Sequence, residues 1–217
     1  MKKRRKIRRK KRRRNRGKRI LLMLASVIFF SLCILVVIFL LRGTSSWMKV
    51  EALKDTEVPA WVQVDLIDID GAARRGKDLE AIEDIVIHYV GNPGTTAQQN
   101  RDFFNNPGVE VSAHFVVGLE GEIIQVLPLN ERSQASNWRN NDTISIEVCH
   151  PDASGKFNET TYQSLVKLTA WLTELCNLDE DNVIRHYDVT EKLCPIYYVE
   201  NEDAWVQFKN DVKEAGR

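Results

Sequence analysis

The front of this 217-residue chain lacks acidic residues. Residues 2–19 contain 15 Lys and Arg and no Asp or Glu. Residues 43–217 have the opposite bias, with 15 basic against 30 acidic residues and hence a net charge of −15. The overall net charge of +1 therefore hides two oppositely charged segments, and this asymmetry indicates that they occupy separate environments.

Charge of either sign is absent from residues 20–41, where only Ser26 and Ser31 are clearly polar. A helix of this length would measure roughly 33 Å and would cross a bilayer core of about 30 Å. A buried core helix is the alternative, but such helices seldom run this far without a polar face. We therefore expect one transmembrane helix at residues 20–41, with residues 1–19 as a cytoplasmic tail and the rest of the chain outside the cell.

A cleaved signal peptide is a second alternative for the same segment. Its apolar region would be shorter, about 7–15 residues, and a cleavage site of small residues would follow it. Residues 41–46 read Leu-Arg-Gly-Thr-Ser-Ser, which is a poor site. We therefore predict an uncleaved, single-pass anchor in the cell membrane.

The basic tail also lacks aromatic and fold-forming residues. Such a tail can bind anionic lipids of the inner leaflet, at about 1 kcal/mol for each basic residue near the surface. Nucleic acid is the competing partner for so many cations. We predict the lipid contact and no specific binding of nucleic acid.

Cysteine is scarce, and the chain shows no internal repeat. Of four cysteines, Cys33 lies in the apolar segment, so Cys149, Cys176 and Cys194 leave at least one thiol unpaired in any disulfide scheme. A metal ligand would account for the odd thiol. We expect residues 42–60 to be a juxtamembrane linker and residues 61–217 to be a single domain.

Hydrophobic periodicity in the outer part predicts a mixture of strands and helices. The predicted strands are residues 84–90, 111–117, 122–127 and 143–149. The predicted helices run from Thr95 or Thr96 to Asn105, with Phe103 and Phe104 on the buried side, and over residues 159–176 and 203–214. The second and third strands should form a hairpin across Glu120-Gly121. Because strands and helices do not alternate strictly, we expect an α/β fold with a mixed central sheet and flanking helices.

A histidine, a lysine and a cysteine share the segment Arg185–Pro195, which we predict to be short and non-helical. His186 and Cys194 are ligand types that zinc prefers, and the charge of Lys192 could stabilise an oxyanion. His88, in the first predicted strand, would complete a three-ligand set with an open position for water. The spacing alone leaves His114 and His150 open as third ligands. Two nitrogens and one sulfur suit Zn²⁺ better than Mg²⁺ or Ca²⁺.

Hydrolysis at such a site needs a general base. Glu147 is a lone carboxylate in an otherwise apolar predicted strand, and we expect it to accept a proton from water. A salt bridge at a strand edge is its alternative role, and an ordinary solvated side chain is the alternative for Lys192. Cys194 could also be a nucleophile with His186 as its base. Pro195 and the loop setting offer no helix N-terminus to activate that thiol, so we favour the metal site.

Four segments, in order, resemble one known family. They are Ile87-His88-Tyr89 with Gly91-Asn92-Pro93-Gly94, Ser112-Ala113-His114-Phe115, Ser145-Ile146-Glu147, and His186-Tyr187-Asp188-Val189-Thr190 through Lys192-Leu193-Cys194-Pro195. Over roughly residues 60–215 the chain resembles the N-acetylmuramoyl-L-alanine amidase type 2 family, which is similar to the peptidoglycan recognition proteins.

The resemblance implies one Zn²⁺ per chain, held by His88, His186 and Cys194. Glu147 matches the acidic catalytic residue, and Lys192 matches the lysine that stabilises the transition state. The implied reaction is hydrolysis of the amide between the lactyl group of N-acetylmuramic acid and L-alanine in peptidoglycan.

One departure and several expectations accompany this resemblance. Some relatives have a catalytic tyrosine where this chain has Ala113, so Glu147 must carry the proton transfer. Asn92 and His114 are expected to contact the substrate, and the protein is expected to be a monomer. Non-catalytic relatives bind wall fragments after losing zinc ligands, so a peptidoglycan-binding module is the alternative function. The presence of both His186 and Cys194 argues against it.

Overall fold

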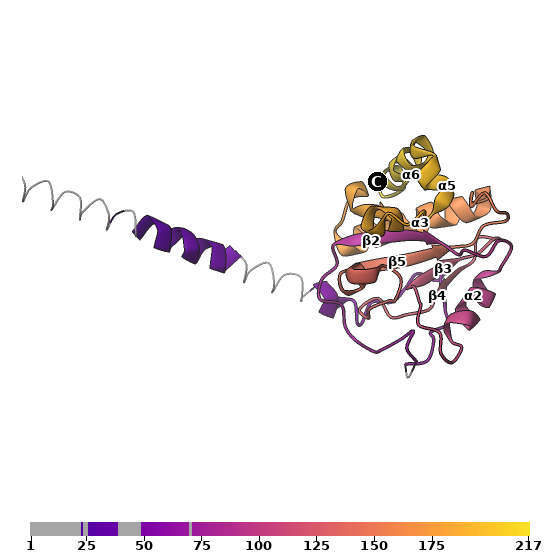
Figure 1. Ribbon diagram of the computed structural model, residues 1–217, viewed down its shortest axis with the longest axis horizontal. Coiled ribbons are helices and arrows are strands. Elements are labelled where there is room, and N and C mark those ends of the chain that lie inside the picture. Colours follow the sequence, from indigo (N-terminus) through magenta and orange to yellow (C-terminus); the bar gives the residue numbers. More distant parts are fainter. Residues whose placement is uncertain (1–22, 24–25, 39–48, 70) are drawn as a thin grey trace, which may run out of the picture. The chain divides into compact units, whose positions relative to one another are not determined.

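The computed structural model describes residue 23 and residues 26–38, 49–69 and 71–217 (Figure 1). The chain divides into two units, residues 1–45 and 46–217. The predicted basic tail, both ends of the predicted transmembrane segment and most of the first half of the predicted linker lie outside the described residues. Residues 26–38 are helical. Within the described ranges, no helix combines the length and apolar character needed to span a bilayer.

The second unit is built on a six-stranded sheet in the order β1-β4-β3-β5-β2-β6. The strands are β1 (Gln63–Val64), β2 (Asp84–Tyr89), β3 (Phe115–Val117), β4 (Ile123–Gln125), β5 (Thr143–Val148) and β6 (Val183–Arg185). Only the β3–β4 pair is antiparallel among the pairs of this sheet, and it forms the predicted hairpin. The expected α/β fold with a mixed sheet is confirmed.

Helices cover both faces of this sheet (Figure 1). The helices are α2 (Ala97–Phe104), α3 (Glu159–Cys176), α4 (His186–Thr190), α5 (Ile196–Glu200) and α6 (Glu202–Ala215), with short 3-10 turns η1 (Asn137–Asn141) and η2 (Glu180–Asn182). One core cluster joins α3 and α6 to one face, through residues such as Ile87, Ile146, Leu168 and Phe208. A second joins α2 to the opposite face, through Ala97, Phe104 and Val116.

Local chemistry explains where the helices begin. Thr96 caps α2 as predicted: its side chain accepts a hydrogen bond from the Gln99 backbone N–H, and the Gln99 side chain accepts one from the Thr96 backbone N–H. The Asn158 side chain caps α3 by accepting a single hydrogen bond from the Thr161 backbone N–H. Both core clusters draw their buried members from residues 50–212, so residues 46–217 carry their own hydrophobic cores.

Three expectations require correction. Phe103 is 50% exposed, and Phe104 alone of the two packs into the core, because neighbouring residues on a helix point about 100° apart. Val50 and Leu53 are buried in the larger core cluster, so packing extends into the segment predicted as a linker. The segment Arg185–Pro195 is not wholly non-helical, since its first half forms α4.

Candidate metal centre

The central strand β2 places His88 beside two functional neighbours. On one side, β5 runs parallel to β2 with Glu147 opposite His88 in the register. On the other side, β6 pairs Ile87 with Arg185, and His186 follows directly at the start of α4. Residues opposite each other in a sheet share a face. The register therefore brings an acid and two histidines to one place at the carboxyl ends of β2, β5 and β6.

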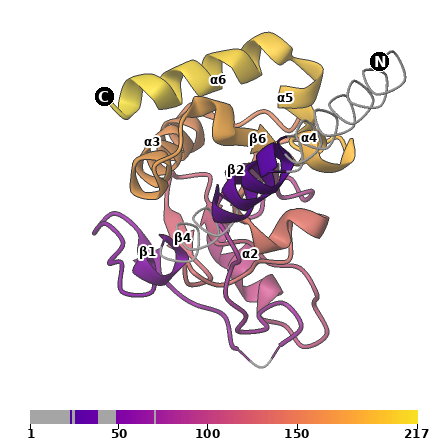
Figure 2. The same ribbon diagram turned by 90° about the vertical axis from the view of Figure 1, so that its left-hand side faces the viewer.

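Helix α4 folds the downstream loop back toward β2. The side chain of Asp188 accepts hydrogen bonds from the backbone N–H and the guanidinium of Arg185, which fixes the first turn. Glu191 then adopts φ 62°, in the left-handed region that ends many helices. The backbone N–H of Tyr187 donates to the Cys194 carbonyl oxygen at 3.0 Å, so the cysteine returns to the start of α4. Figure 2 shows α4 beside β2 and β6.

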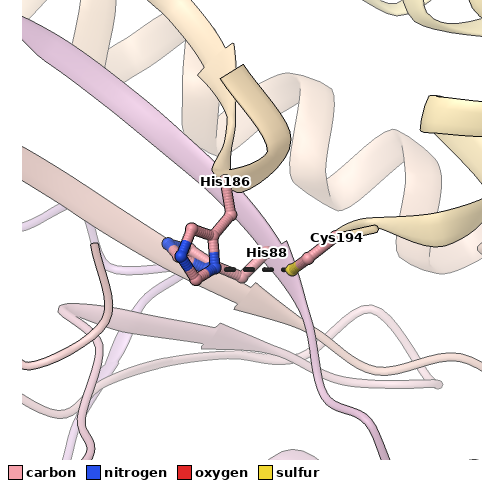
Figure 3. A group of neighbouring side chains, drawn as sticks. All are labelled: His88, His186 and Cys194. Atoms are coloured by element: carbon pink, nitrogen blue, oxygen red, sulfur yellow. Dashed lines mark hydrogen bonds between the residues drawn. The ribbon is translucent and has the colours of Figure 1, made fainter. Parts of the chain in front are cut away.

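The three predicted ligands meet in this structure (Figure 3). One ligand atom from each of His88, His186 and Cys194 lies within 4.8 Å of the others, and all three side chains are buried. The Cys194 Sγ is 3.9 Å from the His88 Nδ1, and the two imidazole ring centroids are 4.7 Å apart. This is also the one group of its kind among the described residues.

The donor set fits a zinc ion. Two imidazole nitrogens and one sulfur suit Zn²⁺ and leave room for a fourth ligand. The Nδ1 atom of His186 is buried and has no hydrogen-bond partner, which is costly unless something else engages its lone pair.

Protonation in this site is set mainly by burial. Burial lowers the pKa values of His88 and His186, and the charge of Lys192 adds to this effect. Both imidazoles are therefore neutral near pH 7, as ligands must be. Burial raises the pKa of the Cys194 thiol to about 12, with the nearby Glu147 charge adding to the increase. A divalent cation would reverse this preference, whereas a cysteine nucleophile would need the opposite environment.

Glu147 has the properties expected of a proton acceptor. Its Oε2 atom is buried and makes no hydrogen bond. Burial raises the pKa of Glu147 to about 7, and the positive charge of Lys192 partly offsets that rise. A carboxyl group with this pKa exchanges protons readily at neutral pH. Lys192 itself is exposed, and its charge acts on Glu147, His88 and His186.

The other candidate histidines lie elsewhere. His114 is fully buried, with its Nδ1 atom 3.0 Å from the Ser145 backbone nitrogen and its Nε2 atom 2.8 Å from the Glu131 carbonyl oxygen. Because both ring nitrogens are engaged in the core, this placement argues against the predicted substrate contact. His150 is likewise buried, and its two ring nitrogens face the carbonyl oxygens of Asp152 and Val90. Neither histidine belongs to the candidate metal group.

The remaining residues singled out from the sequence lie outside the candidate metal group. Asn92 is exposed in the turn after β2, so its substrate contact stays a prediction. Cys149 and Cys176 are buried free thiols. Ala113 is buried within the core cluster around α2.

Two polar residues of this site were missed from the sequence. Ser136 and Asn137 lie at the start of η1. The Ser136 Oγ is 3.2 Å from the His88 Nε2, and the Asn137 Oδ1 is 2.9 Å from the His186 Nε2. The available signal was the segment Ser136–Asn141, which is polar except for Trp138 and lies just before the strand that carries Glu147. Such a run predicts a turn but not its contacts.

Comparisons with known proteins identify the relatives of this chain. A family model described as N-acetylmuramoyl-L-alanine amidase matches residues 78–196. The N-acetylmuramoyl-L-alanine amidase BlyA of Bacillus subtilis (strain 168) is 34% identical over 171 residues, which cover 68% of this chain and 45% of BlyA. CwlL of Bacillus licheniformis, described by the same activity, is 28% identical over 67% of this chain and 45% of its own length. The chain thus spans about half the length of these curated relatives.

Solved structures show the same fold. The catalytic domain of XlyA superposes with a TM-score of 0.61 at 27% identity, covering 70% of this chain and 98% of that domain. The structure of PlyL gives a TM-score of 0.63 at 21% identity, covering 71% of this chain and 98% of PlyL. The similarity to PlyL supports the fold alone.

Proposed function

Because the chain belongs to the N-acetylmuramoyl-L-alanine amidase family, we propose that it is a zinc-dependent amidase of peptidoglycan. The proposed reaction hydrolyses the amide between the lactyl group of N-acetylmuramic acid and L-alanine of the stem peptide. One observation carries the proposal: the side chains of His88, His186 and Cys194 converge, and His88 lies opposite Glu147 where β2 pairs with β5. A binding module would have no need of a carboxyl group with a raised pKa beside a three-ligand metal site.

The residues present divide the chemistry between them. A zinc ion held by His88, His186 and Cys194 would supply Lewis acidity and lower the pKa of water. Glu147 would take a proton from the attacking water and pass it to the leaving amine, for which its pKa of about 7 is suited. Lys192 would place positive charge near the oxyanion of the tetrahedral intermediate. The burial of the site increases the strength of these interactions.

We further propose that residues 20–41 anchor the protein in the cell membrane, with the amidase domain outside. The uncharged run and the 15 basic residues before it support this topology. The 15 basic residues of the tail would contact anionic lipids of the inner leaflet. Cell fractionation with external protease tests the proposal: the domain should sediment with membranes and be digested in intact protoplasts. Full release into the medium would contradict anchoring.

Digestion of purified cell wall tests the proposed activity. Mass spectrometry of wall treated with residues 46–217 should show stem peptides with free L-alanine amino termini and intact glycan strands. The same preparation should contain zinc by elemental analysis. Binding to the wall with no released peptide would favour the binding module. Activity that survives a chelator but is lost to a thiol alkylator would favour Cys194 as a nucleophile.

A further inference from the structure

The two histidines of the candidate metal centre each contact one of two consecutive residues in the same turn through the Nε2 atom. The Ser136 Oγ lies 3.2 Å from the His88 Nε2, and the Asn137 Oδ1 lies 2.9 Å from the His186 Nε2. Each of these two side chains engages the Nε2 atom of its histidine and leaves the Nδ1 atom for another partner. The His88 Nδ1 faces the Cys194 sulfur, and the His186 Nδ1 is buried without a partner.

This turn is firmly fixed. The Asn140 Oδ1 accepts hydrogen bonds from the backbone N–H groups of Ala135 and Ser136, at 3.0 Å and 2.6 Å. The Arg139 guanidinium donates to Asp84, the first residue of the strand that carries His88. The turn is therefore closed by its own hydrogen bonds and is tied to the start of the strand that carries His88.

Asn137 is specialised for its position. Its backbone has φ 56°, in the left-handed region that asparagine tolerates better than most residues other than glycine. An amide oxygen only accepts hydrogen bonds, so an imidazole nitrogen facing it must carry the proton. With the proton on Nε2, the lone pair of the His186 ring lies on Nδ1, where a metal would bind. The Ser136 hydroxyl can donate or accept, so it fixes the His88 tautomer less strictly.

We propose that Asn137, with assistance from Ser136, is a positioning residue that holds His186 as its Nε2–H tautomer with Nδ1 directed at the metal position. The inference rests on the proposed zinc site. It assigns a role to the side chain of Asn137, which is not one of the three candidate metal ligands. Loss of such a partner typically weakens metal affinity about 10–100-fold.

Three variants separate the side chain from the backbone. Asn137→Gly keeps the left-handed conformation and removes the acceptor, so its zinc affinity, measured by chelator competition, should fall about 10–100-fold. Asn137→Asp keeps an acceptor oxygen and should remain within a few-fold of the parent protein. Trp138→Ala is the matched control, because Trp138 is the next residue and is 67% exposed. It should leave zinc affinity unchanged.

A second measurement needs no metal and no activity. The chain has four histidines, so ¹⁵N-histidine NMR of metal-free residues 46–217 can assign each tautomer. His186 should be the Nε2–H form in the parent protein and in Asn137→Asp, and a mixture in Asn137→Gly, with His114 unchanged as a sign of intact folding. An Nδ1–H form of His186 in the parent protein would overturn the inference, as would unchanged zinc affinity in Asn137→Gly. Failure of the parent protein to bind zinc would instead refute the proposed function, while the tautomer would still decide the role of Asn137.

Discussion

Replacing Glu147 with glutamine should slow catalysis strongly and stabilise the protein at the same time. Glutamine keeps the size of the side chain but cannot accept the proton, so the rate should fall about 10²–10⁴-fold. The pKa of Glu147 rises from its usual 4.5 to about 7 because the carboxyl group is buried. A tenfold change in an ionisation constant corresponds to about 1.4 kcal/mol, so the buried charge costs up to about 3 kcal/mol at high pH.

The gain in stability should depend on pH in a defined direction. As the pH rises from 4.5 to 7, the unfolded chain loses the Glu147 proton before the folded chain does. The contribution of Glu147 to the free energy of unfolding of the parent protein therefore falls across this window and stays low above it. The Glu147→Gln variant has no such penalty. Its advantage should be close to zero below pH 4.5 and should reach at most about 3 kcal/mol above pH 7.

Urea denaturation of metal-free residues 46–217, followed at several pH values, measures this difference. Glu110→Gln is the matched control, because Glu110 is exposed and its replacement should change neither stability nor activity. Equal stability of the Glu147→Gln and parent proteins above pH 7 would refute the assignment of a raised pKa. Wild-type activity in the same variant would refute Glu147 as the proton acceptor.

Three further predictions concern the rest of the site and the core. Lys192→Ala should lower kcat about 10²–10³-fold if its charge stabilises the oxyanion, and unchanged kcat would exclude that role. A chelator should remove activity and added Zn²⁺ should restore it, whereas a thiol alkylator should act slowly on the zinc-loaded protein because Cys194 is buried; rapid alkylation with loss of activity would contradict the metal site. Burial lowers the pKa of His114 to about 4. In the metal-free Glu147→Gln protein, the free energy of unfolding should therefore fall by at least about 3 kcal/mol as the pH drops from 6.5 to 4, and the lowered pKa values of His88 and His186 add to this fall. Urea denaturation that shows no such fall would contradict this.

The sequence predicted the long elements and the strands that carry His88 and Glu147, but not the β2–β6 pairing that brings His186 to His88. The periodicity of residues 84–90 and 143–149 correctly indicated the two strands that carry His88 and Glu147. The strand β6 is only three residues long, too short for a periodic signal, so the adjacency of His88 and His186 came from family resemblance.

Side-chain partners were harder to predict than elements. His114 was expected to contact the substrate, but its side chain lies in the core, where Ser145 and Glu131 engage both ring nitrogens. The role of Asn137 depends on a turn that lies next to His186 only after folding, 49 residues away along the chain. Local propensity carries no information about such contacts.

Zinc reconstitution of residues 46–217 tests the central claim most directly. Activity on purified wall should rise with added Zn²⁺ and stop rising at one equivalent per chain, and the metal-free protein should be inactive. His88→Ala and Cys194→Ala should bind zinc much more weakly and should release no stem peptide at that ratio. Full activity without metal, or in either variant, would contradict a zinc amidase built on these ligands.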